Sequence, residues 1–159
     1  MNPIRLFTYG TLRSDVQQAA PASMMAFRIL RAAAVSEGAG WARGQLYALS
    51  WYPAFIDRGL AADQVRGEVW RIHRPQVIAQ LNLYEGAEYL RQLLRVTLEN
   101  GREVTAWTYK YRLSLRGVSR IVSGDYLDWV RRHPKAIGAS RWEQGSEHKV
   151  GRTGNPETD

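Results

Sequence analysis

The sequence predicts one α+β domain dominated by β-strands, with two or three helices on its outside. The length of 159 residues is close to the most common size of a single domain. Apolar residues make up 45% of the chain and charged residues 23%, as in ordinary globular proteins. Segments with β-type patterns outnumber helical ones. We expect residues 1–142 to form the domain and residues 143–159, where periodicity vanishes, to form a flexible tail.

The first segments of the chain predict a strand followed by a helical region. A short strand is expected over residues 4–9, and it ends at Gly10, where residues 11–12 open a turn. The alanine-rich residues 15–34 are expected to be helical. This helix should begin afresh near Pro21, because proline suits the first turn of a helix.

Three strand-like segments come next, after a break that we expect at Gly38 and Gly40. They cover residues 43–49, 52–57 and 65–72. The third alternates apolar and polar residues, which is typical of a strand with one buried face.

A helix and a hairpin are predicted in the second half. The helix is expected to begin at Pro75 and to end at Gly86. Two long β-type segments, residues 89–98 and 103–111, flank Asn100 and Gly101. Both of these residues tolerate a positive φ, so the pair favours a tight hairpin turn.

The charge balance of +7 raises the possibility of a nucleic-acid partner. Lysines and arginines form no long run, however, and the densest cluster, residues 131–135, ends a short helix expected over residues 126–131. Asp125 stands near the start of that helix, where a carboxylate interacts favourably with the helix dipole. We therefore do not expect a nucleic-acid partner.

Composition excludes several other classes of site. The chain has no cysteine, which rules out disulfides, thiol nucleophiles and iron–sulfur clusters. His73, His133 and His148 are scattered without the spacing of metal ligands, so we expect neither a metal nor a cofactor. No apolar run reaches the length of a signal peptide or a membrane span, which predicts a cytoplasmic protein.

The first candidate chemical element is Tyr9, Gly10, Thr11 and Leu12, at the end of the first strand. A glycine there lets the backbone turn sharply and frees successive N–H groups from sheet pairing. Such groups can converge on an anion, and Thr11 adds a hydroxyl donor. The alternative is that Gly10 simply makes a turn.

The second candidate is Glu85, at the end of the helix and after the largely apolar residues 81–84. Burial and the negative end of the helix dipole should raise the pKa of this carboxyl toward general acid–base work near neutral pH. The alternative is a surface glutamate or an ion pair with Arg91. Glu68 falls on the polar phase of a strand and should face outward, and Glu88 should be the exposed member of the pair that it forms with Glu85.

These elements belong to a series of segments, in order, that resembles the γ-glutamylcyclotransferase-like superfamily, which includes the AIG2-like proteins. The segments are residues 7–13, 44–47, 51–54, 65–69, 81–91, 106–109 and 121–126. The resemblance implies a small mixed β-barrel with peripheral helices. Asn82 departs from the pattern, because the family often carries aspartate there, but it keeps the ability to form hydrogen bonds.

The resemblance also implies a reaction. Enzymes of this family cyclise a γ-glutamyl group to 5-oxoproline and release an amine or amino acid. Glu85 would then be the general acid and base, and the backbone at residues 9–12 would hold the glutamyl end. Ala54, with Tyr52 and Pro53, and Tyr89 would wall the pocket. The alternative is a non-catalytic protein that binds a small anionic ligand in the same pocket. The sequence assigns neither a leaving group nor an oligomeric state.

Overall fold

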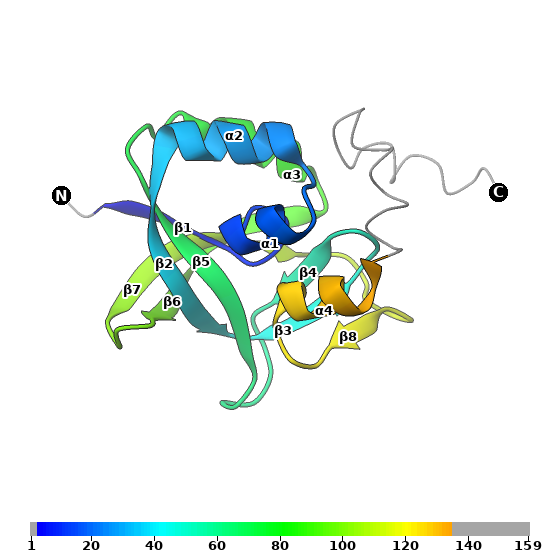
Figure 1. Cartoon of the computed structure of the whole chain (residues 1–159). Helices are drawn as coiled ribbons and strands as arrows, with labels where there is room; N and C mark the ends of the chain where they lie inside the picture. The colour runs from blue at the N-terminus through cyan, green and yellow to red at the C-terminus, as the bar shows by residue number, and fades with distance from the viewer. Residues whose placement is uncertain (1–2, 135–159) are drawn as a thin grey trace.

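A closed, five-stranded β-barrel is the centre of the computed structural model, which describes residues 3–134 (Figure 1). The tail expected over residues 143–159 lies outside the described residues, as does the end of the expected domain. In their order around the barrel, the strands are β1 (Ile4–Thr8), β5 (Gln64–Ile72), β2 (Ala34–Arg43), β6 (Tyr89–Leu98) and β7 (Glu103–Tyr111). Neighbouring strands are antiparallel except β1 and β7, which pair in parallel, so the barrel is mixed, as expected.

A second, antiparallel sheet lies beside the barrel. It consists of β4 (Pro53–Ile56), β3 (Gln45–Ala48) and β8 (Ser119–Ile121). The helix α4 (Tyr126–Arg132) lies next to this sheet in Figure 1. Asp125 caps α4 as predicted, because its carboxylate accepts a hydrogen bond of 3.0 Å from the N–H of Leu127.

Three further helices complete the described fold: Figure 1 shows two of them together at the top of the view and the third between these and α4. They are α1 (Ser14–Ala19), α2 (Met24–Ala33) and α3 (Val77–Glu85). Helix α2 packs against α3, and α1 contacts α4. The first two helices occupy the region predicted as one alanine-rich helix that begins afresh near Pro21.

Apolar side chains from every layer form one continuous core. Its most deeply buried members include Leu30 of α2, Leu46 and Phe55 of the small sheet, and Val65 and Ala106 of the barrel. The helices and the small sheet are thereby fixed against the barrel, which sets the places of the loops between them.

The predicted hairpin is confirmed, because β6 and β7 have the expected bounds. The break expected at Gly38 and Gly40 is wrong, since β2 runs through both residues. Gly38 has a φ of +100° and lies at a shift of register against β5. A Cβ on Gly40 would lie 2.7 Å from Cγ1 of Val96, so glycine permits the close approach of β2 and β6.

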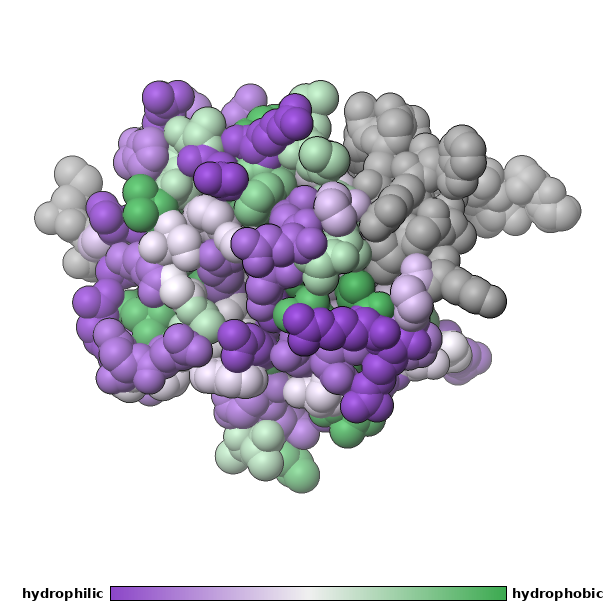
Figure 2. Space-filling model, viewed as in Figure 1, coloured by the Kyte–Doolittle hydropathy of each residue, from purple (hydrophilic) through white to green (hydrophobic). Residues whose placement is uncertain are grey.

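Polar and apolar residues alternate on the surface without forming separate faces in the view shown in Figure 2. Several arginines lie against carboxylates: Arg5 and Arg71 pair with Glu37, and Arg120 pairs with Asp63. Among residues 3–134, no helix has the length and apolar character needed to cross a membrane.

Candidate active site

The loop that follows β1 is held in place by the side chain of Thr8. The Thr8 hydroxyl donates to the carbonyl oxygen of Leu12 at 3.2 Å and accepts a hydrogen bond of 3.2 Å from Nε1 of Trp70. The N–H of Arg13 closes the turn by donating to the carbonyl of Gly10 at 3.1 Å. Residues 9–12 therefore form an ordered loop, which we call the 9–12 loop, at one end of the barrel.

Gly10 brings this loop into contact with β4. A Cβ at this position would lie 2.7 Å from both Cδ and Cγ of Pro53, which is closer than side chains approach. Within residues 3–134, no group accepts a hydrogen bond from the N–H groups of Gly10, Thr11 or Leu12. Three consecutive donors of this kind can bind an anion, as the sequence predicts for this loop.

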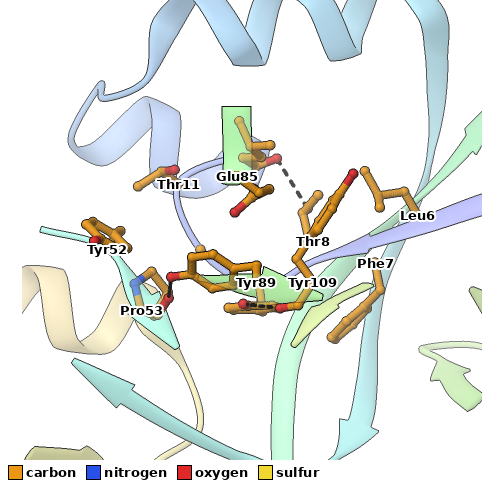
Figure 3. A pocket seen from close by; sticks show the side chains of 12 residues that line it. Leu6, Phe7, Thr8, Thr11, Tyr52, Pro53, Glu85, Tyr89 and Tyr109 are labelled. Atoms are coloured by element: carbon orange, nitrogen blue, oxygen red, sulfur yellow. Dashed lines mark hydrogen bonds between the residues drawn. The ribbon is translucent and has the colours of Figure 1, made fainter. Parts of the chain in front are cut away.

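Glu85 is the last residue of α3 and is 9% exposed. Gly86 follows with a φ of +82°, a conformation that favours glycine, and its N–H donates to the carbonyl of Asn82 at 3.1 Å. The helix thus ends at the carboxylate. In Figure 3, the Glu85 side chain extends from the end of α3 into the space between Thr11 and Tyr89.

Three tyrosines contribute to the wall of the same pocket, and each donates its hydroxyl proton to the protein. Tyr9 donates to the carbonyl of Tyr109 at 2.5 Å, and Tyr89 donates to the carbonyl of Pro53 at 2.9 Å. Tyr109 donates to Oδ1 of Asn82 at 2.7 Å. Asn82 therefore uses the hydrogen-bonding ability predicted for it to fix a residue of the pocket.

The phenol groups of these tyrosines stay protonated at neutral pH. Burial raises the pKa of Tyr9, Tyr89 and Tyr109, and the nearby carboxylate of Glu85 raises all three further. Among the described residues that line the pocket, Glu85 alone carries a carboxylate, and none is lysine, arginine or histidine. Glu85 is therefore the one side chain among these lining residues that can carry a charge near neutral pH.

The pocket brings together six of the seven residues predicted for the site. Its lining residues are Leu6, Phe7, Thr8, Tyr9, Gly10, Thr11, Leu12, Tyr52, Pro53, Glu85, Tyr89 and Tyr109. Ala54, which is fully buried in β4, does not line it, but its neighbours Tyr52 and Pro53 do. Tyr109 was not predicted. It enters the pocket through the pairing of β7 with the rest of the barrel, and no local pattern signals this.

The other two carboxylates singled out in the sequence do not line the pocket. The prediction that Glu88 is exposed is wrong, since only 8% of it is accessible. Its carbonyl accepts a hydrogen bond of 2.9 Å from the N–H of Arg112, which ties the turn before β6 to the end of β7. Glu68 is partly buried and accepts hydrogen bonds from Ser14 and Ser36. Within the described residues, no group of three or more His, Asp or Glu side chains could hold a metal ion.

Comparisons with known proteins agree on one family. The model of the family described as gamma-glutamyl cyclotransferase, AIG2-like, matches residues 6–128. The chain is 36% identical over 86 residues to the gamma-glutamylcyclotransferase family protein YtfP of Escherichia coli K12. That alignment covers 53% of this chain and 68% of YtfP.

Two solved structures show the same fold. The uncharacterized protein PH0828 from Pyrococcus horikoshii superposes with a TM-score of 0.58 and 25% identity, over 83% of this chain and 97% of the other. An AIG2-like protein from Mus musculus superposes with a TM-score of 0.54 and 20% identity, over 69% and 78% of the two chains. With the barrel and the family match over residues 6–128, these findings establish that the chain belongs to the gamma-glutamyl cyclotransferase, AIG2-like family.

Proposed function

We propose that this protein is a γ-glutamyl cyclotransferase, which converts a γ-glutamyl amine, amino acid or peptide into 5-oxoproline and the released amine or amino acid. The observation that carries this proposal is the pairing of one buried carboxylate, Glu85, with the N–H donors of the 9–12 loop in one pocket. Membership of the family supports the same reaction.

The reaction requires a group that moves protons. Glu85 removes a proton from the α-ammonium of the substrate, and the resulting amine attacks the γ-carbonyl carbon. A carbon–nitrogen bond forms and closes the five-membered ring. The bond to the leaving nitrogen then breaks, and Glu85 returns its proton to that nitrogen. The ring nitrogen loses its second proton, which the released amine takes up as an ammonium ion, so that the products are the lactam 5-oxoproline and a free ammonium group. Because the nucleophile belongs to the substrate, positioning supplies much of the rate enhancement, and one acid–base group adds about 10²–10⁴-fold.

Uncharged hydrogen-bond donors bind the glutamyl end of the substrate. The pocket lining contains no cationic side chain in the described residues, so the N–H groups of Gly10, Thr11 and Leu12 are the groups suited to the substrate carboxylate. The rings of Tyr89 and Tyr109 enclose the remainder. The positive net charge of the chain would speed the encounter with an anionic substrate.

The experiment is a mass-spectrometric screen for 5-oxoproline over a panel of γ-glutamyl amines, amino acids and peptides. We expect the wild-type protein to release 5-oxoproline from at least one compound and Glu85→Gln to release none above background. Glu88→Gln is the matched control, because it also neutralises a buried carboxylate but lies outside the pocket, and it should keep the activity. Saturable binding of the panel without product would contradict the proposal and would favour the non-catalytic binding protein.

A further inference from the structure

Ser23 has an unusual backbone conformation. Its φ of 51° and ψ of 42° lie in the left-handed region, and no other residue except glycine has a positive φ among residues 3–134. The residue is 8% exposed. A serine in this conformation is unfavourable in itself and persists only where the surrounding structure imposes it. Such residues concentrate at functional sites.

The side chain of Ser23 also does not form the capping hydrogen bond that is usual at its position. Ser23 directly precedes α2 and occupies the N-cap, where a serine hydroxyl normally accepts a hydrogen bond from the first turn of the helix. Here the side chain makes no such bond. Its oxygen instead accepts a hydrogen bond from the Tyr84 hydroxyl and a long one, of 3.5 Å, from the Thr11 hydroxyl.

These two partners belong to the two halves of the pocket. Thr11 is part of the 9–12 loop, and Tyr84 directly precedes Glu85 in α3. The hydroxyl of Ser23 thus joins the loop that carries the N–H donors to the helical turn that carries the carboxylate.

A second side chain connects the residue before Ser23 to the same loop. Nε2 of Gln17, in α1, donates to the carbonyl of Thr11 at 2.5 Å and also to the carbonyl of Ala22. The residue before Ser23 and the 9–12 loop are therefore tied to the same amide group. This connection holds the chain in place where it turns into α2.

We propose that Ser23 is a positioning residue, which sets the placement of the 9–12 loop relative to Glu85 by joining Thr11 to Tyr84. The inference rests on the proposed function. Cyclisation requires the bound glutamyl group and the acid–base carboxylate to stay aligned, so loss of this connection lowers the rate without removing any group that touches the substrate.

The test is Ser23→Gly, because glycine adopts a left-handed backbone without strain while removing the hydroxyl. We expect kcat/KM to fall by roughly 10- to 100-fold, while Tm stays at or above the wild-type value. Ser23→Ala keeps the strained backbone, so it should show the same loss of kcat/KM with a lower Tm. The control is Ser114→Gly, at an exposed serine outside the pocket, which should keep the wild-type kcat/KM.

Tyr84→Phe removes the hydroxyl that donates to Ser23. It should lower kcat/KM as Ser23→Gly does, and the double variant should be no worse than either single one, since both break one connection. Wild-type kcat/KM in Ser23→Gly would overturn the proposal, and so would a loss that merely follows the unfolded fraction.

Hydrogen exchange separates this inference from the proposed function, because it needs no turnover. The amide proton of Arg13, which closes the loop by donating to the carbonyl of Gly10, should exchange faster in Ser23→Gly than in the wild type. Unchanged exchange would overturn the positioning role even in an active enzyme. A wild type that makes no 5-oxoproline would overturn the proposed function and leave the exchange result standing.

Discussion

Gly10 decides how closely the 9–12 loop approaches β4. The Gly10→Ala substitution would place a methyl group 2.7 Å from two ring atoms of Pro53, so the loop would have to move. We expect kcat/KM to fall by roughly 10- to 100-fold, because the donors for the substrate carboxylate are displaced. Steady-state kinetics on the substrate found in the panel would measure this loss.

The contact between Gly10 and Pro53 also supplies a control for this prediction. Pro53→Ala deletes the ring atoms that the new methyl group would meet, so Gly10→Ala combined with Pro53→Ala should recover part of the lost kcat/KM. A fully active Gly10→Ala variant would show that the position of the loop does not matter to the reaction. A double variant worse than the sum of the single ones would show that Gly10 acts in some other way.

At the scale of elements, Glu68 of β5 caps the helix α1. Its carboxylate accepts hydrogen bonds from the N–H and the hydroxyl of Ser14, at 2.7 and 2.9 Å, and from the Ser36 hydroxyl at 2.6 Å. We expect Glu68→Ala to lower the free energy of unfolding by about 1–2 kcal/mol, as urea denaturation would measure. Glu103→Ala, at an exposed glutamate, should change it by less than about 0.5 kcal/mol. Equal effects would argue against the cap.

The elements that the sequence predicted well are those with local signals. Asn100 and Gly101 place the β6–β7 hairpin, and Gly86 marks the end of α3. Gly40 was misread as a break, because its reason lies in the contact of β2 with Val96, more than fifty residues away. The strand β8 was missed because three residues carry no periodicity.

The residues of the candidate site were likewise predicted only where a local sequence signal marks them. The 9–12 loop and Glu85 were predicted from short segments, and the structure brings them into one pocket. The place of Tyr109 could not be predicted from its neighbours in sequence, since it depends on the pairing of β7 with β1. The burial of Glu88 likewise has no signal in the neighbouring sequence. The link through Ser23 depends on a backbone conformation that no propensity predicts.

At the scale of the whole molecule, Arg13 joins distant parts of the chain. Its side chain is 1% exposed and pairs with Asp15 of α1 at 2.7 Å and with Asp125, the cap of α4, at 2.9 Å. Burial alone would raise the pKa of Asp15, but the hydrogen bonds and charge of Arg13 outweigh it and lower that pKa. The pKa of Glu37 is lowered in the same sense: burial would raise it, and the hydrogen bond and charge of Arg5 outweigh that effect.

This arrangement predicts how stability depends on pH. A carboxyl whose pKa is lower in the folded state contributes stability above its unfolded pKa, about 4, and loses it as the pH falls through the folded value. The free energy of unfolding should therefore decline as the pH falls below about 4. Urea denaturation between pH 7 and pH 2.5 should show a shallower decline for Asp15→Asn than for the wild type. Identical slopes would contradict the role given to the Arg13 pair.

The central claim concerns the proton carried by Glu85, and a single-turnover measurement tests it most directly. The rate of 5-oxoproline formation is compared between the wild type and Glu85→Gln, with saturating protein and the substrate identified in the panel. We predict that the rate falls by about 10²–10⁴-fold while the Kd for the substrate changes little, because Glu85 moves protons and the 9–12 loop binds the glutamyl end. Equal rates in the two proteins would contradict the account.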